Sequence, residues 1–176
     1  MTTLVRRTIQ ALAGVLLLGA VTAAGERSPE LCTSAVRVDT STWRHIRTDV
    51  FTLRLPRAYR GIRVRGIDTA VHRWNAPRHR TVGSDYGYVH YVGGGPFRDP
   101  ELVCESGPRD SWRIIAYAER GVYGVGYYGL DPSRDDRALV LEARSPRRED
   151  VPELLAIIRS MRWAGRPPLV GTQVSP

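Results

Sequence analysis

Four histidines are the side chains of this sequence best suited to acid–base chemistry or to metal binding at neutral pH. They are His45, His72, His79 and His90. None of them belongs to an HxH or HExxH pattern, and none lies four residues from another on a predicted helix. The sequence therefore predicts no metal site.

One acid–base pair can be assembled from these residues. If residues 69–74 and 82–91 pair as a hairpin, His72 would lie near Asp85 across the ladder. A histidine oriented by a carboxylate is half of a general-base apparatus. The nucleophile is missing, because Ser84 lacks the GxSxG setting of a hydrolase elbow. A secreted hydrolase that uses His72 and Asp85 is therefore the alternative hypothesis. The other reading is that both residues are surface polar groups, or that Asp85 accepts hydrogen bonds in a turn.

A glycine pattern typical of dinucleotide-binding proteins occurs at residues 124–129, which read GVGYYG. That function requires a helix to begin there, with its N-terminus facing the pyrophosphate. Residues 130–132 instead predict a turn, and the tyrosines favour a strand. We interpret these glycines as sites of close packing or a bulge, and we expect no cofactor.

Basic residues dominate the charge of the chain. All 26 of them are arginine, and the formal net charge is +8. The lack of lysine excludes Schiff-base catalysis, a phosphate-loop lysine and a serine–lysine dyad. Arg78, His79 and Arg80 form a basic cluster in a predicted loop, and Arg147-Arg148 is a smaller one. The larger cluster could bind an anionic ligand or an acidic envelope protein, or it is simply solvated. Nucleic acid is not an expected partner, since no recognised module is present.

Tyrosines gather in two segments, at residues 86, 88 and 91 and at residues 123, 127 and 128. Strand alternation would place Tyr86 and Tyr88 on one face and Tyr91 on the other, unless a bulge intervenes. Core and cross-strand packing accounts for most such tyrosines. An exposed group would instead indicate a surface that contacts carbohydrate or protein.

The first 24 residues have the layout of a secretory signal peptide. Arg6 and Arg7 precede an apolar run over residues 11–24, which ends in small residues. The run is short for a membrane anchor, although a retained anchor stays an alternative. The mature chain is therefore expected to be secreted or periplasmic, with no stable membrane span after cleavage. In that oxidising setting, Cys32 and Cys104 predict one disulfide.

The mature sequence reads as one α+β domain over residues 43–164, between a leader at 25–42 and a loose tail at 165–176. Strands are predicted from alternation and apolar runs at 50–55, 62–67, 69–74, 82–92, 112–118, 122–130 and 138–143. One helix is predicted at 151–163, with Asp150 and Glu153 as a capping box and Pro152 in the first turn. Five apolar residues, Leu154, Leu155, Ile157, Ile158 and Met161, form its inward face. The expected architecture is an antiparallel sheet with this C-terminal helix packed on it.

The order of these elements resembles a known family. The opening strand FTLRLP at 51–56, the β-rich middle and the closing helix LLAIIRSM at 154–161 are similar to the PsbP-like sandwich. Segments GIDT at 66–69 and SDYG at 84–87 are similar to stretches in uncharacterised secreted bacterial members. The resemblance implies binding or assembly roles more often than catalysis, and it supplies no active site. We therefore expect an exported, non-enzymatic binding or assembly module of the bacterial cell envelope.

Overall fold

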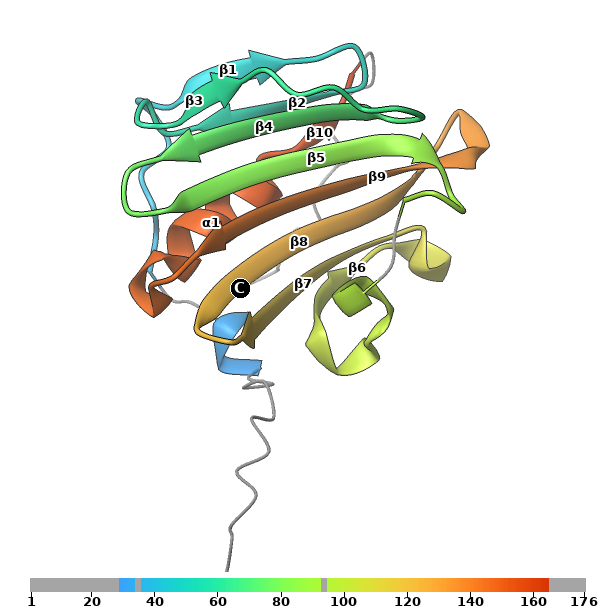
Figure 1. The fold of residues 1–176 in the computed structure, drawn as a ribbon. Helices are drawn as coiled ribbons and strands as arrows, with labels where there is room; N and C mark the ends of the chain where they lie inside the picture. The colour runs from blue at the N-terminus through green and yellow to red at the C-terminus, as the bar shows by residue number, and fades with distance from the viewer. Residues whose placement is uncertain (1–28, 34–35, 93–94, 165–176) are drawn as a thin grey trace, which may run out of the picture.

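The described part of the chain folds into two antiparallel sheets with one α-helix between them (Figure 1). The computed structural model describes residues 29–33, 36–92 and 95–164. The predicted signal peptide at 1–24 and the predicted tail at 165–176 lie outside the described residues. Within them, the expected α+β class and the C-terminal helix are confirmed.

The larger sheet has seven strands in the order β3-β4-β5-β9-β8-β7-β6. Their bounds are β3 Arg60–Ile62, β4 Ala70–Ala76, β5 Arg80–Tyr88, β6 Val103–Ser106, β7 Trp112–Glu119, β8 Val122–Asp131 and β9 Arg134–Ser145. Short 3-10 turns, η2 Gly95–Arg98 and η3 Pro100–Leu102, connect β5 to β6, and η4 Pro108–Asp110 connects β6 to β7. Each neighbouring pair is antiparallel, so most connections are hairpins.

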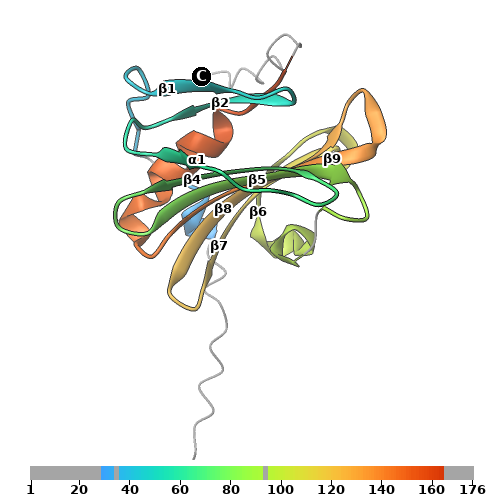
Figure 2. The same ribbon diagram turned by 45° about the horizontal axis from the view of Figure 1, so that its top comes forward.

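The smaller sheet and the helix lie on one side of this sheet. The smaller sheet has the order β1-β2-β10, with β1 Arg44–Arg47, β2 Phe51–Leu55 and β10 Arg162–Trp163. The helix α1 spans Val151–Arg159, directly after the turn η5 Arg148–Asp150. In the turned view, α1 lies between the small sheet and the large one (Figure 2). Among the described residues, no α-helix covers the opposite face of the large sheet.

The main core forms where these three layers meet. Alternation places Phe51, Leu53 and Leu55 on one face of β2, and all three are buried, as the sequence predicts. From the helix, Ile157 and Ile158 are fully buried at helical spacing. Removing this apolar surface from water is the main force that fixes the helix on the sheet.

The helix ends earlier than its apolar pattern predicts. It stops at Arg159, because the hydroxyl of Ser160 donates to the Ile157 carbonyl (2.6 Å) and accepts from the Arg54 amide (2.8 Å). That cap turns the chain toward the small sheet, where Trp163 pairs with Phe51. The predicted helical stretch 160–163 is therefore wrong, and its last two residues form β10.

The predicted capping box is also wrong. Asp150 makes no side-chain cap and instead accepts a hydrogen bond from the Ser145 hydroxyl (2.6 Å). Glu153 turns away from the helix end and binds the side chains of Tyr59 (3.2 Å) and Arg80 (2.7 Å). Both carboxylates bind side chains outside the helix, so neither forms the capping box.

Three strand predictions differ from the structure. The expected strand at 82–92 is wrong after Tyr88, because β5 covers Arg80–Tyr88 and the amides of Tyr91 and Val92 both donate to the Tyr88 carbonyl in a turn. The expected strand at 62–67 is wrong beyond its first residue, because β3 covers only Arg60–Ile62 and residues 63–67 are exposed without a partner strand in the described chain. The strand β9 begins at Arg134, earlier than predicted, because Asp131 accepts hydrogen bonds from the Ser133 amide and hydroxyl (2.8 and 2.7 Å). These bonds tighten the expected loop into a two-residue turn. Strands β1 and β6 were not predicted.

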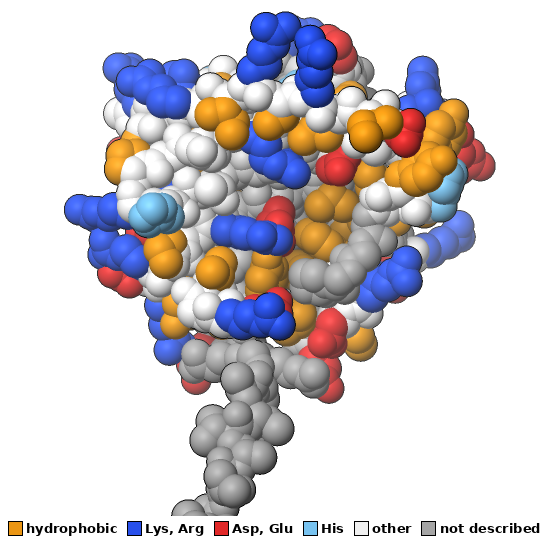
Figure 3. Space-filling view, in the orientation of Figure 1, with side chains coloured by type: hydrophobic (Ala, Val, Ile, Leu, Met, Phe, Trp, Pro, Cys, Tyr) orange, Lys and Arg blue, Asp and Glu red, His pale blue; other side chains and the backbone are white. Residues whose placement is uncertain are grey.

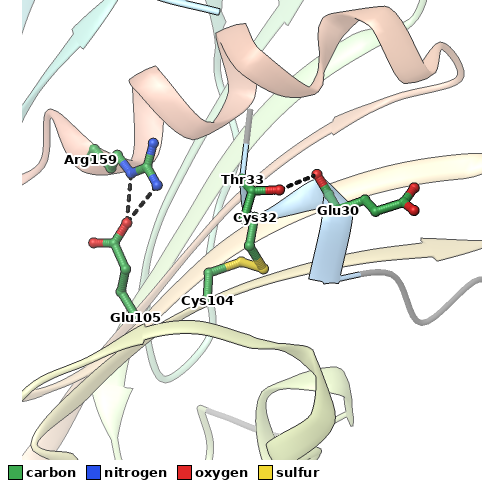
Figure 4. The surroundings of a disulfide bond; sticks show 6 residues. All are labelled: Glu30, Cys32, Thr33, Cys104, Glu105 and Arg159. Carbon is green, nitrogen blue, oxygen red and sulfur yellow. Dashed lines mark hydrogen bonds and ion pairs between the residues drawn. A yellow bond between two sulfur atoms is a disulfide. The ribbon is translucent and has the colours of Figure 1, made fainter. Parts of the chain in front are cut away.

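The predicted disulfide is confirmed. Cys32 and Cys104 are bonded, with their Cα atoms 5.2 Å apart, and no free cysteine occurs in the described residues. The bond joins the short turn η1 Pro29–Leu31 to the edge strand β6 (Figure 4). Leu31 beside it is buried in the main core. A segment far from the sheet in sequence is thereby attached to its edge.

Candidate functional site: the outer face of the large sheet

A cavity lies on the face of the large sheet that points away from α1. Its volume is about 310 Å³. Nine of its lining residues come from the strands β4, β5 and β9, and three more come from the chain that follows β5. The nine are Arg73, Thr81, Val82, Gly83, Ser84, Asp85, Val140, Glu142 and Arg144, and the three are Tyr91, Val92 and Phe97. Figure 3 views the molecule from this side and shows a hollow in which charged and hydrophobic side chains meet.

Strand alternation explains why these side chains share a face. In β9, Leu141 and Ala143 are buried on the helix side, so Glu142 and Arg144 point to the outer side. Asp85 in β5 lies beside Val140 of β9 in the ladder. Polar residues that the sequence interleaves with core residues are thus collected on one surface.

Gly83 is part of the cavity lining. Gly83 pairs with Arg73 of the neighbouring strand, and a Cβ atom at this position would collide with the Arg73 guanidinium. The arginine therefore lies flat across β5. Its Nη1 donates to the carbonyls of His72 (3.2 Å) and Ser84 (3.1 Å), which holds the side chain in place.

A second large side chain covers another glycine on the same face of the sheet. The ring of Tyr117 covers Gly124, where a Cβ atom would again collide, and its hydroxyl donates to Glu142. Glu142 also forms an ion pair with Arg144 (2.6 Å). Burial, followed by the nearby Glu142 charge, raises the pKa of Tyr117 well above its ordinary value. The phenol therefore remains a hydrogen-bond donor at neutral pH.

Asp85 differs from Glu142 in having no such partner. Its Oδ1 is enclosed by the protein and accepts no hydrogen bond. Among the described residues, no ion pair joins it to Arg73 or to any other cation. A carboxylate in this situation is destabilised unless a cation or a donor reaches its open side.

Aromatic side chains close one side of the cavity. Phe97 packs over Gly126 and joins Ile115 and Tyr117 in a second small core. Tyr91, by contrast, is 59% exposed at the rim. After β5 the chain forms a turn, in which the Tyr91 amide donates to the Tyr88 carbonyl (2.8 Å).

The two tyrosine segments have different roles. Tyr88 and Tyr91 form an edge-to-face pair 6.3 Å apart, and the Arg137 guanidinium lies 4.3 Å from the Tyr88 ring centre. Tyr88 and Tyr91 are both exposed, whereas Tyr127 is buried in the main core. Tyr86 packs on the helix side and donates to Asp131 (2.7 Å). An exposed aromatic group therefore exists, next to the cavity.

The structure does not bring His72 and Asp85 together, so the predicted acid–base pair is wrong. In the ladder, His72 lies opposite Ser84, and Asp85 lies one residue further along, on the other face of the sheet. His72 stacks on Trp74 (5.8 Å) on the helix side. A shift of one residue exchanges the faces of a strand, and the hairpin pattern alone does not fix that register. Ser84 is buried and its hydroxyl has no partner.

The predicted basic cluster is divided by the fold. Arg78 and His79 are exposed at the β4–β5 turn, both with φ near +60° (62° and 58°). Arg80 is only 16% exposed, since it pairs with Glu153 and lies 5.6 Å from the Tyr59 ring centre. Arg80 thus serves the core contact of the helix, and the three residues do not form one anion-binding group.

The smaller basic cluster, Arg147 and Arg148, is held in ion pairs. Arg147 pairs with Glu149, and Arg148 pairs with Glu30 of the leader (3.1 Å). The glycine pattern at 124–129 lies within β8, as the sequence predicts, and its glycines admit the rings described above. Within the described residues, no group of three acidic, histidine or cysteine side chains could hold a metal ion.

Sequence reasoning missed the main residues of the cavity, namely Arg73, Glu142 and Arg144. The signal was present in the alternation of charged with apolar residues in LVLEAR at 139–144. The prediction of a strand at 138–143 rests on its apolar residues alone. Charges in a central strand indicate a polar or functional face, and this feature could have identified the site.

Comparison with known proteins supplies no family. No protein-family model matches the chain, and no curated protein is significantly similar to it. Function therefore has to be inferred from the geometry of the chain itself.

Proposed function

We propose that this chain is an exported, non-enzymatic binding or assembly module of the bacterial cell envelope, and that the outer-face cavity is its ligand site. One observation carries the proposal. Arg73 and Asp85 line the same cavity with opposite charges, yet they form no ion pair with each other. Such charges are costly in a partly buried site unless something else compensates them.

The distribution of side chains supports binding more than catalysis. The cavity walls combine a few fixed polar groups with the apolar surfaces of Val92, Phe97 and Val140. This mixture is typical of small-molecule sites. No histidine or cysteine is among the lining residues that the structure describes, and His72 lies on the other side of the sheet.

The cysteines support the proposed export. Both are consumed in one disulfide, which is the usual state in an oxidising compartment. In the described part of the chain, no helix has the length and apolar character that crossing a membrane requires. The disulfide is compatible with a secreted or periplasmic protein whose signal peptide has been removed.

The layered arrangement also suits the PsbP-like sandwich that we propose for this chain. The large antiparallel sheet, the closing helix and the opening strand FTLRLP at 51–56 support it. A fold of this kind says little about the ligand, so the cavity carries the functional argument.

The test uses the full chain, produced in a bacterial host that exports it and recovered from the envelope fraction. Native mass spectrometry then measures any bound molecule in the wild type and in Val140→Phe, which fills the cavity by bulk. Val122→Phe, at the start of β8 and partly exposed, is the matched control. We expect wild type and control to carry the same added mass and Val140→Phe to lose it.

Four results would count against the proposal. The wild type could carry no bound molecule in any preparation, or Val140→Phe could retain it fully. The recovered ligand could also be converted to a product by the wild type, which would make the chain an enzyme. Cytosolic retention with both thiols free would refute export.

A further inference from the structure

We infer that the outer-face cavity takes a small zwitterion that carries both an ammonium group and a carboxylate, such as a free α-amino acid or a short peptide with free termini. The inference rests on the proposed function, because it names the ligand class of the same cavity. The volume of the outer-face cavity, about 310 Å³, is at the lower end of the range for small-molecule pockets. That size suits one or two amino-acid residues better than a large ligand.

The charges of the cavity point to this class. Four charged side chains line it, and two of them neutralise each other, because Glu142 and Arg144 are 2.6 Å apart. Glu142 also accepts the Tyr117 hydroxyl. One cation, Arg73, and one carboxylate, Asp85, remain for a ligand. A ligand with a single charge would match one of them and leave the other poorly solvated.

Arg73 is prepared to bind a carboxylate. Its Nη1 is used by two backbone carbonyls, of His72 and Ser84, and these bonds fix the plane of the guanidinium over Gly83. Nε and Nη2 make no hydrogen bond among the described residues. A guanidinium with a fixed plane and a free edge can donate two parallel bonds to a carboxylate.

Asp85 is prepared to bind a cation. Its Oδ1 is enclosed and has no donor, so the carboxylate depends on a partner at its open side. In the ladder it lies between Val71 and Val140, and these apolar neighbours reduce its hydration. An ammonium group that reaches this carboxylate supplies both the missing charge and hydrogen-bond donors.

The remaining wall is apolar and aromatic. Val92 and Phe97 are buried beside the charged pair, and Tyr91 stands exposed at the rim. An aliphatic or aromatic side chain of the ligand can pack here and remove apolar surface from water. The site therefore favours a zwitterion with an apolar side chain over glycine.

The test is isothermal titration of the purified, oxidised chain without its predicted signal peptide at 1–24. The probes are alanine, phenylalanine and alanyl-alanine in both stereochemical forms, together with N-acetyl-phenylalanine and phenylalanine amide. We expect at least one zwitterion to bind, and each blocked derivative of it to bind at least about tenfold more weakly, since a hydrogen bond to a charged group is lost.

Variants separate the two recognition groups. Asp85→Asn is expected to weaken zwitterion binding at least about tenfold and to abolish discrimination against the N-acetyl probe. Arg73→Gln is expected to abolish discrimination against the amide probe. Asp135→Asn and Arg63→Gln, at exposed positions away from the cavity, are matched controls that leave binding unchanged. Thermal unfolding of each variant confirms that the fold is retained.

The inference and the proposed function fail in different ways. If blocked and free probes bind equally, or if only inorganic phosphate or a neutral saccharide binds in a manner sensitive to Val140→Phe, the zwitterion inference is wrong and the binding function stands. If no probe binds and the exported chain carries no ligand in the native mass spectrum, both are wrong.

Discussion

Removing the disulfide is expected to cost this protein much of its stability. The double variant Cys32→Ser/Cys104→Ser opens a loop with a sequence separation of 72 residues. In the chain-entropy model, closing a loop of that length lowers the entropy of the unfolded chain by an amount worth about 4 kcal/mol at 25 °C. A typical domain is stable by only about 5–15 kcal/mol, so the loss is a large fraction of the total.

The assay is urea unfolding at neutral pH, followed by thermal unfolding. For a domain of this size, 4 kcal/mol corresponds to a fall in melting temperature of about 10–15 °C. The slope of the urea transition measures whether the unfolded state has also expanded. The wild type without reductant is the reference.

A second variant tests whether the reduced leader still packs. Leu31, next to Cys32, is buried in the main core, so Leu31→Ala should cost about 2–5 kcal/mol in the oxidised chain. If the segment leaves the core without its disulfide, the same substitution costs little in the serine variant. The reasoning would be refuted if the serine double variant were less stable than the oxidised wild type by under about 1 kcal/mol. Neither loop entropy nor core packing would then depend on the disulfide.

The remaining predictions concern packing and pH. Gly124→Ala should destabilise the fold by about 1–3 kcal/mol in urea unfolding, because the Tyr117 ring occupies the space that the new methyl group needs. The same substitution should cost less in a Tyr117→Ala background. Equal costs of Gly124→Ala in the two backgrounds would contradict this explanation. Ile157→Ala should cost about 2–5 kcal/mol by the same assay, since the side chain is fully buried, and a cost under about 1 kcal/mol would show that it does not pack as described. Burial raises the pKa of Tyr86 and of Tyr127 to about 12, so the unfolded chain loses these protons first and stability falls between pH 10 and 12. Urea midpoints across that range measure the fall, Tyr127→Phe should reduce it, and midpoints independent of pH would contradict it.

Within the described residues, the elements that follow from local pattern were predictable. Strands β2, β4, β7 and β8 and the helix face at 154–158 are set by alternation or by helical spacing of apolar residues, which any compact fold must bury. The disulfide followed from there being two cysteines and an expected oxidising compartment. These features need no knowledge of which segments meet.

The candidate site was not predictable in the same way. Pairing His72 with Asp85 required the register of one hairpin, and a difference of one residue placed them on opposite faces. Arg80 and Glu153 are 73 residues apart, so their ion pair depends on how the helix packs against the hairpin.

Sequence alone determined which residues alternate, which segments are apolar and where the chain turns, because these depend on neighbours a few positions away. Only the tertiary structure decided that Arg73, Asp85 and Glu142 share one surface, because three strands had to be aligned side by side. It also left Arg73 and Asp85 without mutual pairing while giving Glu142 its partners. Long-range packing assigns partners to charges, and local sequence does not contain that information.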